Sequence, residues 1–180
     1  YSGCVVSDPT SGLKAKKVVS KIPEILTDDE LRKLLAAFED IDKPFAVFIA
    51  LTGCRRGEAC KLKWSDVNLP KVVFRGVKEG GDKVLFLPPA LVQILEALPS
   101  RRGYVFPTPQ GRMRKHNLSR LIQRAPQRAG IKKRVHWHML RHTAATNLIM
   151  HESPAVVQML LGHRNLSTTM RYLHVAGKHL

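Results

Sequence analysis

Only one part of this 180-residue chain carries the pattern of a β-sheet. Two runs rich in β-branched and aromatic residues, KVVFRG at 71–76 and KVLFLP at 83–88, flank the Gly-rich segment KEGGD and predict a hairpin. Elsewhere the regularly spaced apolar residues follow the helical period. These patterns predict a mainly α-helical fold with a small antiparallel β-sheet.

The helices can be placed from their periodicity and their start and stop signals. Thr27 and Glu30 form the S/T-x-x-E signature of a capping box, followed by leucines at helical spacing, and so mark the start of the first helix. Helices are expected at about residues 28–38, 44–53, 55–63, 88–98, 117–129, 137–150, 154–161 and 166–175.

Length and composition favour one folded domain. A chain of 180 residues with 44% hydrophobic residues can fill a single core, which excludes a disordered tail.

The longest apolar run, 45–51, is far shorter than the roughly 20 residues that cross a bilayer, and no signal peptide is visible, so we expect no membrane partner. Residues 1–22 are rich in Gly, Ser, Pro and Lys without periodicity, as in a linker.

The positive charge is large and unevenly distributed. Thirty Lys and Arg against 14 Asp and Glu give a net charge of +16, and twelve of these basic residues lie between Glu96 and Glu152, where no acidic residue occurs. Such a field indicates a polyanionic partner, with nucleic acid the first candidate. A metal-dependent nuclease needs clustered carboxylates, which this stretch lacks.

Three cysteines, Cys4, Cys54 and Cys60, are odd in number and lack the CxxC pairing of a zinc ribbon. Structural disulfides belong mainly to oxidising compartments. We therefore expect a reducing, cytoplasmic environment and no structural disulfide.

The predicted helix 117–129 carries a basic stripe. Apolar side chains occupy its other faces, and Pro126 is expected to kink or shorten it. A helix laid against the DNA backbone has this pattern, and an ordinary solvated face is the alternative. The stripe consists of the arginines that recur every fourth residue, Arg120, Arg124 and Arg128.

The segment WHMLRH places His138 and Arg141 on neighbouring turns of one helix face. An imidazole beside a guanidinium combines a proton-transfer group with a phosphate clamp, although a partly buried histidine and a surface arginine would look the same. His138 and His142 also have the spacing of zinc ligands. A zincin, however, needs Glu where Met139 stands, and Arg141 would place a positive charge beside the ion, so we expect no metal.

The segment GCRRGE places Arg55 at the start of a helix, with Glu58 three residues later. A helix N-terminus favours anions, and an arginine there can add a bidentate contact to a phosphate. Glu58 could hold this arginine or a histidine in place. An ordinary surface pair of Arg55 and Arg56 is the alternative.

The segment LLGHRNLSTTMRYLHV places His163 after a glycine helix stop and Tyr172 nine residues later. Arg171 and His174 flank Tyr172, and cationic surroundings favour the phenolate over its ordinary pKa of about 10. Taken alone, a tyrosine at this position is more often a packing residue than a nucleophile.

In this order the GCRRGE box, a lysine on a β-turn, the HMLRH box, the LGH box and a downstream tyrosine resemble the catalytic domain of the tyrosine recombinases. This family includes phage integrases and chromosome-dimer resolvases. The resemblance spans about residues 27–175. It implies the tyrosine recombinase catalytic-domain fold over residues 23–180, with 1–22 as the linker from an N-terminal core-binding domain.

The resemblance also implies a role for each motif residue. Arg55 and Arg141 are the two phosphate-clamping arginines, and Glu58 is the supporting acidic residue after the first of them. Lys78 is the hairpin lysine, and His138 is the histidine of the second box. His163 occupies the position that the family fills with His or Trp, and Tyr172 is the nucleophile.

The implied activity is site-specific DNA recombination, including integration of mobile elements. Tyr172 attacks the scissile phosphate, forms a 3′-phosphotyrosine and releases a 5′-hydroxyl, so that no cofactor is required. His138 exchanges the proton of the nucleophile, and Lys78 protonates the leaving oxygen, with Lys83 as the alternative acid. The implied partners are double-stranded DNA and further copies of the chain, which is a monomer in isolation and a homo-tetramer on DNA.

Two other functions remain open at this stage. A type IB topoisomerase shares this constellation by resemblance and would relax supercoils without pairing two sites. A non-catalytic DNA-binding module would need only the basic stripe, and Tyr172→Phe would then change nothing measurable.

Overall fold

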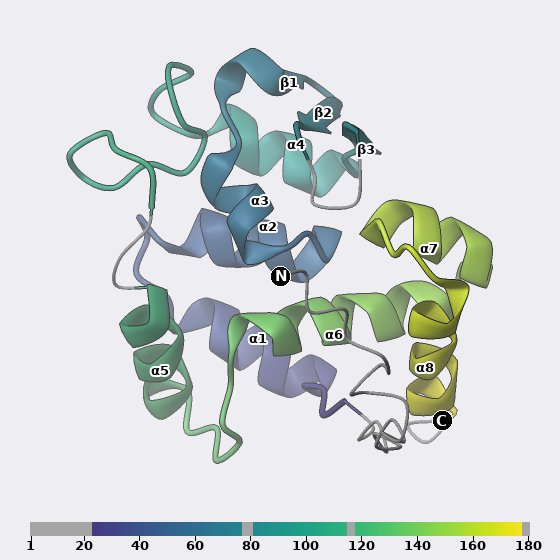
Figure 1. Ribbon diagram of the computed structural model, residues 1–180. Helices are drawn as coiled ribbons and strands as arrows, with labels where there is room; N and C mark the ends of the chain where they lie inside the picture. The colour runs from purple at the N-terminus through teal and green to yellow at the C-terminus, as the bar shows by residue number, and fades with distance from the viewer. Residues whose placement is uncertain (1–22, 77–80, 115–117, 178–180) are drawn as a thin grey trace, which may run out of the picture.

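The computed structural model describes residues 23–76, 81–114 and 118–177 (Figure 1). Within these ranges the chain is mostly helical with one small sheet, as predicted. The α-helices are α1 (Asp28–Ala36), α2 (Lys43–Thr52), α3 (Arg56–Lys61), α4 (Pro89–Glu96), α5 (Leu118–Arg128), α6 (Trp137–Ile149), α7 (Pro154–Leu161) and α8 (Leu166–Ala176). A 3-10 turn, η1 (Trp64–Asp66), precedes the strands β1 (Val67–Asn68), β2 (Lys71–Phe74) and β3 (Lys83–Phe86).

The sheet is antiparallel in the order β1-β2-β3. Val72 of β2 lies opposite Leu85 of β3, and both side chains are buried. The predicted hairpin is therefore confirmed. The two-residue strand β1 is too short to produce an alternating pattern and was not predicted. Lys78 lies between β2 and β3, outside the described residues, as do residues 1–22.

Local signals start and stop the helices as expected. The Thr27 Oγ1 atom accepts a hydrogen bond from the Glu30 amide at 3.2 Å, and the Glu30 carboxylate accepts one from the Thr27 amide at 2.8 Å, which confirms the capping box. Pro126 lies inside α5, where it cannot donate to the carbonyl four residues earlier, and the helix ends two residues later at Arg128. The third helix ends at Lys61, two residues before its predicted end.

Gly53 ends α2 in the left-handed conformation, with φ 61°. A Cβ atom at this position would lie only 2.6 Å from Cδ2 of Leu161, at the end of α7. Gly53 is therefore required both by the turn and by the close approach of α7, which brings two segments about 110 residues apart into contact.

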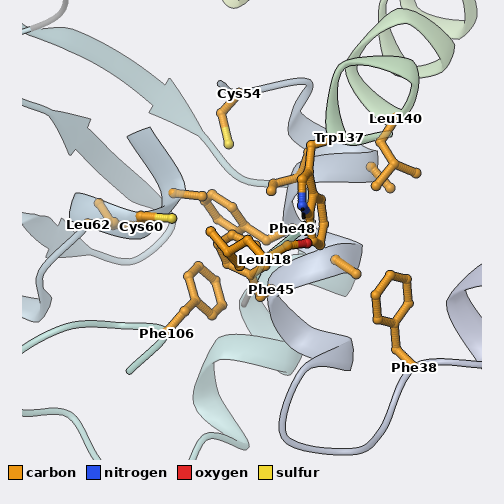
Figure 2. Close-up of a cluster of buried hydrophobic side chains, with 14 of the residues drawn as sticks. Phe38, Phe45, Phe48, Cys54, Cys60, Leu62, Phe106, Leu118, Trp137 and Leu140 are labelled. Carbon is orange, nitrogen blue, oxygen red and sulfur yellow. Dashed lines mark hydrogen bonds between the residues drawn. The ribbon is translucent and has the colours of Figure 1, made fainter. Parts of the chain in front are cut away.

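The main core lies between α2, α6 and the loop that follows α4 (Figure 2). Phe45 packs edge to face against Trp137 and Phe106, with ring centroids 5.1 and 5.6 Å apart. The Trp137 indole N–H donates to the carbonyl of Leu118 at 2.9 Å, which attaches the start of α5 to the start of α6. Burying each of these large apolar side chains contributes about 1.5–3 kcal/mol.

A second, smaller cluster joins α7 and α8 to the C-terminal half of α6 (Figure 1). Its members include Ala145 and Ile149 of α6, Leu161 of α7, and Tyr172 of α8. The candidate nucleophile is thus also part of a packed core. None of the described helices is long and apolar enough to span a lipid bilayer.

Candidate active site

Arg55 lies immediately before α3 and is held there by Glu58. The Glu58 carboxylate accepts hydrogen bonds from the Arg55 amide at 2.9 Å and from its Nη1 at 3.1 Å. The Nη2 atom of Arg55 reaches the carbonyl of Gly162 at 3.4 Å. The helix start and the carboxylate together orient this guanidinium toward the turn that follows α7.

Arg141 is buried on α6, with 4% of its surface exposed. Its Nη1 donates to the carbonyl of Gly53 at 2.7 Å, and its Nη2 to the carbonyl of Leu161 at 2.8 Å. The alternative of a surface arginine is therefore wrong. Burial lowers the pKa of Arg141, and the neighbouring charge of Arg55 lowers it further. Two cations held so close to each other favour the binding of an anion.

Lys83 of β3 also lies in this region. Its ammonium group donates to the second Glu58 oxygen at 2.8 Å, with both side chains only 9% exposed, and lies 4.6 Å from the centre of the Phe74 ring. Burial would raise the pKa of Glu58, but Lys83 and the other donors outweigh it and hold that pKa below its usual value. The carboxylate is therefore ionised and shared between a lysine and an arginine.

Tyr172 lies on α8 with 4% of its surface exposed. Its hydroxyl oxygen is 2.8 Å from Nδ1 of His142, and its ring stacks on that of His163 with centroids 5.9 Å apart. Burial raises the pKa of Tyr172, and this outweighs the lowering by Arg141 and Arg171. The expectation that cationic neighbours favour the phenolate is therefore wrong for this state, because the sequence does not reveal how deeply the ring is buried.

His163 follows Gly162, which ends α7 with φ 65°, as the sequence predicted. Its Nδ1 lies 2.9 Å from the hydroxyl oxygen of Thr169, a fully buried residue of α8. This bond and the stacking contact with Tyr172 fix the orientation of the imidazole.

His138 lies one turn before His142 on α6, with the two rings 5.8 Å apart and nearly perpendicular. It lines a pocket together with Arg55, and its side chain is more exposed than that of His142. Partial burial lowers the pKa of His138, and the charge of Arg141 lowers it further, so the ring is neutral at neutral pH. The histidine that contacts the tyrosine hydroxyl is His142, for which the sequence pattern indicated only the rejected role of a zinc ligand.

These motif residues come from α3, α6, the end of α7 and α8, and they meet at one place in the fold. The family profile of phage integrases matches residues 24–179. The chain belongs to the phage integrase family.

Individual relatives agree with this membership. A tyrosine recombinase of Thermosipho africanus is 35% identical over 98% of this chain and 66% of its own length. The crystal structure of XerA recombinase has a TM-score of 0.73 and 30% identity, covering 85% of this chain and 59% of that one. The catalytic domain of bacteriophage HP1 integrase has a TM-score of 0.69 and 26% identity over 87% of this chain and 90% of that one. The fold is thus that of a tyrosine recombinase catalytic domain, and the chain spans about two thirds of the length of its curated relatives or less.

The basic stripe of this phage integrase family member lies apart from the clustered motif residues. Its three arginines are exposed on α5 and line a hollow with Glu39 and Asp42. Arg128 Nη2 forms an ion pair with Glu39 at 2.9 Å. Of the two pockets that Arg55 lines among the described residues, the one that reaches α5 is lined there by Ser119, Ile122 and Gln123 and not by the stripe arginines. The structure therefore does not bring the basic stripe together with Arg55 and Arg141, and DNA contact by the three stripe arginines stays a prediction.

The described ranges contain no group of three or more His, Cys, Asp or Glu side chains that could hold a metal ion. Cys54 and Cys60 are buried free thiols, and burial raises the pKa of Cys54 to about 12. A thiol with so high a pKa is inert as a nucleophile at neutral pH.

Proposed function

We propose that this chain cleaves and rejoins DNA strands through a 3′-phosphotyrosine on Tyr172, as the catalytic part of a site-specific recombinase. The observation that carries the proposal is the pair of bonds from Arg141 to the carbonyls of Gly53 and Leu161. These bonds attach the turn before Arg55 to the turn before His163, so that two guanidinium groups and an imidazole surround one site.

The charge of this site fits a phosphodiester. Arg55, Arg141 and Lys83 carry three positive charges against the single carboxylate of Glu58, which leaves a local excess of two. A bound phosphate offsets this excess. In the transition state the phosphate oxygens gain charge, and fixed guanidinium groups in a partly buried site stabilise that charge without reorganising.

Transesterification needs a nucleophile, a proton acceptor and a proton donor, but no cofactor. Tyr172 is the proposed nucleophile, and Lys78 is the proposed acid for the leaving 5′-oxygen. Lys83 is the weaker candidate because its ammonium group is already bonded to Glu58. His138 is neutral at neutral pH, and its exposed side chain lines a pocket with Arg55, where it can exchange protons with solvent and substrate.

The proposed partners are double-stranded DNA and further copies of the chain. A net charge of +16 supports a polyanionic partner, and membership of the phage integrase family supports DNA. We propose a monomer in isolation, a tetramer on DNA, and a DNA-associated location in the cytoplasm of a prokaryotic cell. Residues 23–180 are the proposed catalytic unit, with 1–22 as its linker.

Covalent capture tests the proposed chemistry. The chain is incubated with a pool of nicked duplexes randomised around the nick, because loss of the short fragment blocks religation. A protein–DNA adduct that survives denaturing electrophoresis is expected, with EDTA present or absent, and Tyr172→Phe should abolish it. An adduct that persists in Tyr172→Phe, or one that EDTA prevents, would contradict the mechanism.

The same captured sequence separates recombination from topoisomerase activity. Two copies placed on one plasmid are expected to recombine, with the products read by sequencing. Supercoil relaxation without any exchange between the two copies would support the topoisomerase alternative instead.

A further inference from the structure

His142 occupies a position that the family motifs leave without a role. It follows Arg141 directly on α6, and its Nδ1 lies 2.8 Å from the hydroxyl oxygen of Tyr172 on α8. The two rings are 5.7 Å apart at an angle of 41°. His142 is therefore in direct contact with the atom that would attack the phosphate.

The surroundings of His142 decide which partner holds the proton of this bond. Burial disfavours a charged imidazole, and so do the positive charge that His138 or His136 would carry when protonated and the fixed charges of Arg141 on the same helix and Arg171 on α8. Together they lower the pKa of His142 to about 4. The pKa of Tyr172 is raised, so at neutral pH a protonated phenol faces a neutral imidazole.

On this geometry, and resting on the proposed function, we propose that Nδ1 of His142 accepts the proton of Tyr172 as the tyrosine attacks the phosphate. A bond forms between Oη and phosphorus while the bond from phosphorus to the 5′-oxygen breaks. The Oη proton moves to Nδ1, and the leaving oxygen takes its proton from the acid of the site. Religation reverses each step, and His142 returns the proton to Tyr172.

This arrangement couples activation of the nucleophile to DNA. A weak acid facing a weak base does not exchange its proton at rest, so the unbound protein carries no phenolate. A phosphate bound by Arg55 and Arg141 adds negative charge near His142 and offsets the field that disfavours its protonation. Proton transfer therefore accompanies bond formation to phosphorus and does not precede it.

The other two histidines of the site make different contacts. His163 meets the Tyr172 ring face to face, and its Nδ1 is bonded to Thr169. The His138 ring lies 5.8 Å from that of His142, and its side chain lines a pocket with Arg55. Among the three, His142 is the one hydrogen-bonded to the tyrosine hydroxyl, so the proposal gives it the proton exchange with the nucleophile that the family resemblance implied for His138.

His142→Asn separates proton acceptance from positioning, because an amide can occupy the place of Nδ1 and hydrogen-bond to the hydroxyl but cannot take its proton. We expect single-turnover cleavage of the captured nicked duplex to fall by about 10²–10⁴-fold, with unchanged affinity for that duplex. His151→Asn, the same change at an exposed histidine just beyond α6, is the matched control and should cleave normally. Cleavage by His142→Asn at the rate of the unmodified chain would overturn the proposal.

A fluorinated tyrosine at position 172 gives a readout that a purely structural role would not change. Its phenol is more acidic and needs less help from a base, so the penalty of His142→Asn should shrink markedly. An undiminished penalty would overturn the proposal. If the proposed function itself is wrong, the unmodified chain forms no adduct at all, which is a different result.

One measurement on the unsubstituted protein does not depend on how the variants fold. Nitrogen-15 NMR at pH 7 should find Nδ1 of His142 without a proton, with the proton on Nε2. A proton on Nδ1 would make His142 the donor to Tyr172 and would overturn the proposal.

Discussion

Arg141 donates from Nη1 to the carbonyl of Gly53 over 2.7 Å, and so attaches α6 to the turn that leads into Arg55. The same guanidinium reaches the carbonyl of Leu161 through Nη2. Only a forked side chain can make both bonds and still present further N–H groups to a ligand. The position of one clamp arginine thus depends on the other.

Replacing Arg55 or Arg141 by lysine should therefore impair the protein in different ways. Arg55→Lys and Arg141→Lys should each slow cleavage by about 10²–10³-fold, because a lysine keeps the charge but cannot span two phosphate oxygens. Arg141→Lys should also lower the free energy of unfolding by about 1–3 kcal/mol, since a buried carbonyl loses its donor. Gel-shift affinity, single-turnover cleavage and urea unfolding on the same preparations check this. Loss of DNA binding in proportion to cleavage would instead mark both arginines as anchors.

The general acid can be identified with a substrate whose leaving group needs no proton. Lys78→Ala should slow cleavage of normal DNA by about 10²–10⁴-fold and leave a 5′-bridging phosphorothiolate almost unaffected, because sulfur leaves readily as the anion. Lys83→Ala, the matched control on the other side of the turn, should not show this rescue, since Lys83 is bonded to Glu58. Rescue of Lys83→Ala and not of Lys78→Ala would reverse the assignment.

Features that depend on residues close together in the sequence could be predicted, whereas features that depend on contacts between distant residues could not. The capping box of Thr27 and Glu30 and the glycine stop at Gly53 depend on neighbours a few residues away, and they were found. The contact of His142 with Tyr172 spans thirty residues and depends on how α8 packs on α6, so no local pattern indicated it. The pKa of Tyr172 was misjudged for the same reason, because its burial comes from tertiary packing.

The charged groups of the site predict how stability changes with pH. His142 has a pKa of about 4 in the folded chain against 6.5 as its ordinary value, so the unfolded state binds more protons between these limits. Stability should fall as the pH drops through this window, by at most about 3 kcal/mol for this group. Urea unfolding at pH 7 and pH 5 should show a smaller loss for His142→Asn than for His151→Asn. Equal losses would mean that His142 is not held neutral by the fold.

The basic stripe on α5 predicts a salt dependence of DNA binding. Replacing Arg120, Arg124 and Arg128 by Ala should flatten the log-log dependence of affinity on salt by about 2 to 3, because each phosphate contact releases about one counterion. Fluorescence anisotropy on a short duplex measures this slope. Removing Arg32 and Lys33, exposed cations of α1 paired with Asp29, is the control and should flatten it less for each charge removed. An unchanged slope in the triple variant would exclude α5 from the interface.

The identity of the covalently linked residue tests the account most directly. The trapped protein–DNA adduct is digested with protease and nuclease, and the modified peptide is sequenced by mass spectrometry. The nucleotide should be attached to Tyr172 through a 3′-phosphate. Attachment to Tyr104, to any non-tyrosine residue, or through a 5′-phosphate would contradict the mechanism derived from this site.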